Sequence, residues 1–61
     1  MTKTETQALT NVRMYAVAGL RDTAARSLSA LIRAARTNAS KAELLAEARK
    51  LGVDKLPGFV V

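Results

Sequence analysis

The residues in this sequence that are best suited to chemistry are its arginines and lysines. The chain contains ten Lys and Arg but five Asp and Glu, so its formal net charge is +5. A charge of this sign favours acidic partners, namely nucleic acid, an anionic membrane surface or an acidic protein face. The alternative interpretation is that the charge serves only solubility, since small domains often carry a net charge of this size.

Three arginines fall on one arc of a predicted helix. At about 100° per residue, Arg26, Arg33 and Arg36 share an arc with Asp22 and Ser29. The planar guanidinium can bind two phosphate oxygens at once, and most protein–DNA hydrogen bonds go to phosphate and sugar. The spacing therefore predicts a ridge that contacts a nucleic-acid backbone, and the alternative is a solvated helix face.

Enzymatic chemistry is not predicted. The sequence has no His and no Cys, which general acid–base and nucleophilic catalysis commonly use. Glu43 and Glu47 share a helix face at i, i+4 spacing. Because lysines flank them, we expect both glutamates to be surface charges. A zinc site would lack its thiolate and imidazole ligands. We therefore expect a non-enzymatic binding protein that uses no cofactor and no metal.

The elements that must position the basic residues are helices. Ala, Leu and Arg, which are good helix formers, dominate from Ala8 to Leu51. Capping-box pairs occur at Thr4 with Gln7 and at Thr2 with Glu5, so the first helix is predicted to begin near residue 4.

The first helix is predicted to run over about residues 4–36. The alternative is a bend or break near residues 19–22, since Gly19 costs about 1 kcal/mol relative to Ala inside a helix. Asp22 is then a candidate N-cap for a second helix that begins at Thr23. We favour the single helix, because the apolar stripe continues across Gly19 in phase.

A shorter helix is predicted over about residues 41–51. Ser40 and Glu43 form a capping box at its start. Gly52 supplies a left-handed residue at its end, and Val53 can make the hydrophobic contact that accompanies such an end. The segment Ala48–Val53 resembles the centre of a helix-turn-helix, but the same residues are fully explained as a helix terminus.

The tail, residues 53–61, is predicted to pack rather than hang free. Pro57 and Gly58 favour a type II turn, and the last three residues are apolar and β-favouring. An apolar end exposed to solvent would promote association with other molecules. We therefore expect the tail to dock either on its own helices or on a neighbouring chain.

The predicted long helix carries apolar or small residues over more than half of its circumference. A helix that lies on one neighbour needs an apolar stripe of only about 100°. The shorter helix can cover one arc, and nothing remains in the chain to cover the other. The sequence therefore predicts a homodimer. The expected interface consists of Ala16, Gly19, Leu20, Thr23, Ser27 and Leu31.

Together these patterns predict one all-α domain over residues 1–61, a helical hairpin paired as a homodimer. The expected function is a small nucleic-acid-binding or regulatory protein. The alternative is a protein-interaction module, such as an inhibitor, adaptor or assembly subunit, that uses an exposed apolar helix face.

The longest apolar run, Met14 to Leu20, is far shorter than the roughly 20 residues of a membrane span. Absence of Cys fits a reducing compartment, so we expect a cytoplasmic protein.

Overall fold

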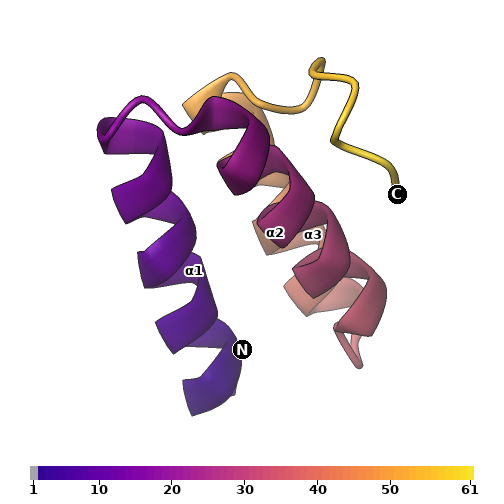
Figure 1. Ribbon diagram of the computed structural model, residues 1–61. Helices are drawn as coiled ribbons and strands as arrows, with labels where there is room; N and C mark the ends of the chain where they lie inside the picture. Colours follow the sequence, from indigo (N-terminus) through magenta and orange to yellow (C-terminus); the bar gives the residue numbers. More distant parts are fainter. Residues whose placement is uncertain (1) are drawn as a thin grey trace.

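Three α-helices make up the computed structural model, which describes residues 2–61. The helices are α1 (Lys3–Val17), α2 (Arg21–Ala34) and α3 (Asn38–Leu51). They run up, down and up, and α2 packs against both α1 and α3 (Figure 1). The predicted all-α class is confirmed, and no strand occurs within residues 2–61. The predicted two-helix hairpin is wrong, because the first predicted helix is two helices.

A turn at Gly19 separates α1 from α2. Gly19 has φ = 84°, a left-handed conformation that glycine adopts at little cost. Its N–H donates to the Ala16 carbonyl at 3.2 Å, and the Leu20 N–H donates to the Tyr15 carbonyl at 2.9 Å. This pair of hydrogen bonds is the Schellman motif, which ends helices. The predicted single helix over residues 4–36 is therefore wrong, and the chain takes the alternative of a break at this glycine.

The first two helices begin in different ways. α1 starts with the capping box of Thr2 and Glu5, in which each backbone N–H donates to the other residue's side chain at 3.0–3.1 Å. α2 begins at Arg21, after Leu20, whose side chain makes no cap hydrogen bond. Asp22, the predicted N-cap, lies inside the first turn instead. Its carboxylate there still complements the positive end of the helix dipole.

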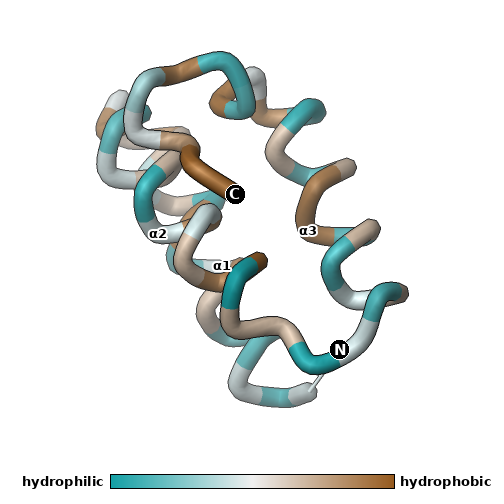
Figure 2. Tube along the Cα trace, turned by 90° about the vertical axis from the view of Figure 1, so that its right-hand side faces the viewer, coloured by the Kyte–Doolittle hydropathy of each residue, from teal (hydrophilic) through white to brown (hydrophobic). Residues whose placement is uncertain are grey.

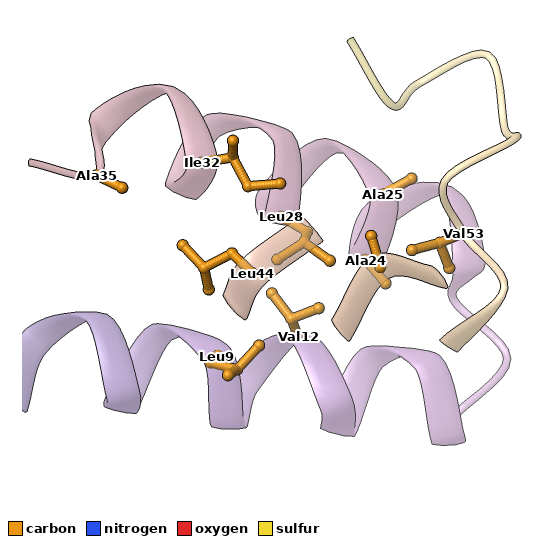
Figure 3. Close-up of a cluster of buried hydrophobic side chains, with 10 residues drawn as sticks. Leu9, Val12, Ala24, Ala25, Leu28, Ile32, Ala35, Leu44 and Val53 are labelled. Carbon is orange, nitrogen blue, oxygen red and sulfur yellow. The ribbon is translucent and has the colours of Figure 1, made fainter. Parts of the chain in front are cut away.

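The break allows α1 and α2 to cover each other within one chain. Leu9 and Val12 of α1 point toward Leu28 of α2 and Leu44 of α3 (Figure 3). The buried apolar core is Leu9, Val12, Ala24, Ala25, Leu28, Ile32, Ala35, Leu44, Ala48 and Val53. The predicted homodimer rested on a long helix with an arc that only a second chain could cover. That reason no longer holds, and pairing of chains stays a prediction.

The start of α3 lies three residues earlier than predicted. Thr37 is its N-cap, and the Thr37 hydroxyl oxygen accepts a hydrogen bond from the Ser40 N–H at 3.1 Å. Ser40 is therefore inside the helix and buried, so the predicted capping box of Ser40 with Glu43 is wrong.

The end of α3 is as predicted. Gly52 has φ = 73°, and the Val53 N–H donates to the Ala48 carbonyl at 3.0 Å. Val53 is fully buried, so it makes the hydrophobic contact that accompanies a left-handed end. No helix follows within residues 53–61, and the segment that resembles a helix-turn-helix is a helix terminus.

The tail returns along α2 (Figures 1 and 2). The Val60 N–H donates to the Ser29 hydroxyl oxygen at 2.9 Å, and Phe59 packs against the core. The tail thus docks on the chain's own helices, which was one of the two predicted outcomes. Gly58 is not among the glycines with positive φ. The predicted type II turn, which requires positive φ at that position, is therefore wrong.

Candidate functional site

The predicted arginine ridge divides into two parts. Arg26 and Arg33 lie on α2, and both are exposed. They are seven residues apart, so they share a face and lie about 10 Å apart along the helix axis. Arg36 lies beyond the end of α2, in the connection to α3. The structure therefore brings two of the three predicted arginines together on one helix face and not the third.

Arg36 is directed to a different part of the molecule. It lines a shallow depression with Glu5 and Thr2, beside the start of α1. The pKa of the Glu5 carboxyl lies below its usual value, mainly because the Thr2 backbone N–H donates to it, and the Arg36 charge is a smaller cause. Arg36 thus acts on a carboxylate of α1 and does not extend the ridge.

The tail lies against the stem of Arg26. A Cβ atom added at Gly58 would be 3.1 Å from Arg26 Cγ, so glycine allows the tail to pass close to this arginine. Arg26 nevertheless remains exposed. The tail therefore borders the ridge on one side without covering its charged end.

The six predicted interface residues do not form one surface. Leu31 is partly buried against the core, as is Ala16. Ser27 is also half-buried, whereas Gly19, Leu20 and Thr23 are exposed at and after the turn. The predicted arc required a continuous helix, and the turn at Gly19 removes that continuity.

An apolar surface lies on α1 and the following turn, and Leu20 is its one residue that belongs to the predicted interface. Met14, Val17 and Leu20 have exposed fractions of 63%, 88% and 52%. We call these three residues the apolar stripe. Val12 faces the core, and Met14 lies about 200° away from it around the helix, so Met14 and Val17 point outward. On a helical wheel of α1 alone, Val12 and Val17 lie on different faces of the helix.

Two residues of the apolar stripe, Met14 and Val17, lie on a wide, open face of α1. It is lined by Thr10, Arg13, Met14, Val17 and Ala18. These residues have the i, i+3, i+4, i+7 spacing of one helix face. This face of α1 is therefore open to solvent over about two turns.

No protein-family model, curated protein or solved structure matches this chain. Its function is therefore argued from its own surfaces.

An ion pair beside this face joins α1 to α3. Arg13 Nη2 lies 2.9 Å from Glu47 Oε1, and Arg13 Nε donates to Glu47 Oε2 at 3.3 Å. This two-point contact fixes the guanidinium plane. The side-chain hydrogen bond from Arg13 is the main reason that the pKa of Glu47 is lowered, and the Lys50 charge lowers it further. The same hydrogen bond raises the pKa of Arg13.

The ion pair makes part of the folding stability depend on pH. Because the pKa of Glu47 is lower in the folded chain, its contribution is present above the ordinary glutamate value of 4.5. It is lost as the pH falls through the lowered value. We expect the melting temperature of the Glu47→Gln variant to fall less than that of the wild type as the pH is lowered from above 4.5 through that lowered value.

Thermal unfolding followed by circular dichroism at a series of acidic pH values measures this difference. The control is Glu43→Gln, the same change at an exposed position of α3, which should retain the wild-type pH dependence. Equal pH dependence of wild type and Glu47→Gln would show that the ion pair does not couple stability to pH.

The described residues show neither a metal cluster nor a membrane span. Residues 2–61 contain no group of three or more acidic, His or Cys side chains placed to hold a metal ion. None of the three helices is long and apolar enough to cross a membrane. The candidate surfaces are therefore the α2 arginines and the α1 apolar stripe.

Proposed function

We propose that the protein binds nucleic acid by contacting its phosphate backbone through Arg26 and Arg33. The observation that carries the proposal is the pair of exposed guanidinium groups on one face of α2. Within residues 2–61 the one ion pair is that of Arg13 with Glu47. Nine of the ten basic side chains, Arg26 and Arg33 among them, therefore form no ion pair within these residues.

The spacing of the two arginines suits a nucleic-acid strand. Their separation of about 10 Å along α2 corresponds to about three rises of 3.4 Å along the axis of duplex DNA, so two phosphates a few nucleotides apart lie within reach of the pair. Ala30 lies between them, is exposed and is small, so it lets the backbone approach the helix. Asp22, one turn before Arg26, would repel phosphate and thus sets the limit of the contact on that side.

The salt dependence of duplex DNA binding tests the proposal. Each phosphate contact contributes about 0.9 to the slope of log K against log salt. We expect the double variant Arg26→Ala, Arg33→Ala to lower that slope by about 2 and to weaken binding at low salt. Fluorescence anisotropy with a short labelled duplex over a salt series gives both quantities.

A matched double variant distinguishes a local contact from a general effect of charge. Lys41→Ala with Lys50→Ala removes the same amount of charge from exposed positions of α3, and it should change the slope less. An equal loss in the lysine variant would show that binding follows net charge alone. A wild-type protein that does not bind the duplex at low salt would refute the proposed function.

A second candidate function is a protein-interaction module that uses the apolar stripe. The supporting observation is the exposure of Val17, 88% of whose surface is open to solvent. Single exposed apolar residues are common on proteins, but Met14 and Leu20 adjoin Val17 here, and grouped apolar residues favour a binding surface. The occupant could be a second copy of the chain or a different protein.

A further inference from the structure

We propose that the tail strengthens the nucleic-acid contact by restricting the Arg26 side chain before it meets phosphate, and that the buried Ser29 hydroxyl holds the tail in place. The inference rests on the proposed binding of phosphate by Arg26 and Arg33. It adds to that site a positioning residue, Ser29, and a positioning segment, the tail.

Ser29 makes every hydrogen bond between the tail and α2 within residues 2–61. Its hydroxyl oxygen accepts from the Val60 N–H at 2.9 Å and lies 3.3 Å from the Gly58 carbonyl oxygen. A hydroxyl has a single proton to donate, and the Ala25 carbonyl at 2.8 Å is its nearer acceptor. The bond from the Val60 N–H is therefore the main polar contact that fastens the tail. Because Ser29 is only 4% exposed, water has little access to this bond.

Ser29 lies on the same side of α2 as the two arginines. It is three residues after Arg26 and four before Arg33, which places it within about 60° of each around the helix. A Cβ at Gly58 would lie 3.1 Å from Arg26 Cγ and 3.5 Å from Arg26 Nε, so the tail passes directly beside this side chain. The tail then reaches Ser29 through the Val60 N–H and so runs along the arginine face of α2 (Figures 1 and 2).

The contact with the tail reduces the conformations open to the Arg26 side chain. A free arginine side chain loses rotamer freedom when it binds a ligand, and that loss lowers the affinity. Because the tail occupies space beside Cγ and Nε of Arg26, part of the loss occurs on folding instead. Arg26 nevertheless remains exposed and able to meet phosphate. Docking of the tail and binding of phosphate should therefore strengthen each other.

The Ser29→Ala variant tests the role of the hydroxyl, because it removes the acceptor of the Val60 N–H with little change in side-chain volume. In the free protein, the order parameter of the Val60 N–H from nuclear magnetic resonance relaxation should fall from about 0.85 to below about 0.6. The variant should bind a short labelled DNA duplex about two- to tenfold more weakly than the wild type. The salt slope should be unchanged, since both arginines remain.

Two further variants separate the tail contact from an effect on α2 itself. Val60→Pro removes the same hydrogen bond from the tail side, at a residue that is 54% exposed, and it should weaken DNA binding to a similar extent. Ser27→Ala makes the same chemical change on α2 at a residue that has no hydrogen bond to the tail within residues 2–61. It should bind DNA as the wild type does.

A double-mutant cycle tests whether the tail acts through Arg26. In the Arg26→Ala background, adding Ser29→Ala should cause little further loss of DNA affinity. In the Arg33→Ala background, Ser29→Ala should keep its two- to tenfold effect. A general disturbance of α2 would instead weaken binding equally in both backgrounds, and that result would overturn the proposal.

Other results would also overturn the proposal. Equal mobility of the Val60 N–H in the wild type and in Ser29→Ala would show that the hydroxyl does not hold the tail. A variant with a released tail that binds DNA as tightly as the wild type, or more tightly, would show that the tail does not prepare Arg26. Wild-type protein that binds no duplex would refute the proposed function and the coupling together, and the order parameters would still report whether Ser29 holds the tail.

Discussion

Replacing Leu44 with Ala is expected to leave the chain largely unfolded near physiological temperature. Leu44 is fully buried and lies between α1 and α2 (Figure 3). Removing a buried leucine side chain costs about 2–5 kcal/mol, because apolar contacts are lost and a cavity remains. A folded chain of 61 residues has a total stability of about 3–9 kcal/mol. The substitution thus removes a large part of the whole stability.

Thermal unfolding by far-ultraviolet circular dichroism measures the loss. Each kcal/mol should lower the melting temperature by about 4–8 °C in a domain of this size. The control is Leu20→Ala, the same chemical change at a side chain that is 52% exposed, which should have a much smaller effect. Equal effects of the two substitutions would contradict the position of Leu44 in the core.

The second large effect is expected at Gly52. An alanine there must keep positive φ, which costs about 1–2 kcal/mol for a residue with a Cβ. Its Cβ would also lie 3.3 Å from Arg21 Nη2, so the guanidinium would shift from the Gly52 carbonyl that it contacts. Gly52→Ala should therefore lower stability by the backbone cost and weaken the link between α2 and the end of α3.

Gly19 provides the matched comparison for Gly52. It has φ = 84°, but nothing lies within 4 Å of an added Cβ. Gly19→Ala should thus cost the backbone term alone, and chemical denaturation should show a smaller loss than for Gly52→Ala. A Gly19→Ala variant of unchanged or higher stability would show that α1 and α2 can join into one helix, as the sequence pattern favoured.

The two glycines also show how far the sequence could determine the fold. At Gly52 the left-handed preference of glycine and the following Val53 favoured a helix end, and the structure agrees. At Gly19 the same hydrogen-bond pattern forms, but the apolar residues on its two sides continue in helical phase. Periodicity cannot distinguish one amphipathic helix from two that happen to share a phase, because tertiary packing decides the break.

A similar competition decided the start of α3. Thr37 and Ser40 both have a hydroxyl that can accept from a backbone N–H three residues later. The sequence favoured Ser40, since Glu43 completed a capping box. In the structure Thr37 caps the helix and Ser40 is buried within its first turn. The burial of Ser40 depends on the packing of the whole bundle, which local patterns do not contain.

The candidate surfaces could be predicted in part. The exposure of Arg26 and Arg33 agrees with the polar arc, because α2 has the predicted periodicity across both residues. Arg36 does not share the helix face of the other two arginines, because α2 ends at Ala34. The exposure of Val17 could not be read from a single long helix, because apolar or small residues covered more than half of its circumference.

The position of α2 between α1 and α3 has a consequence for the rate of folding. Each helix packs against its neighbour in sequence, and the two connections are three residues long. The entropy lost in closing such short loops is small, and bundles dominated by local contacts fold in microseconds to milliseconds. α2 forms one half of two overlapping hairpins, and Leu28 belongs to the core that both share. Substitutions in α2 should therefore slow folding, whereas those in the tail should mainly accelerate unfolding.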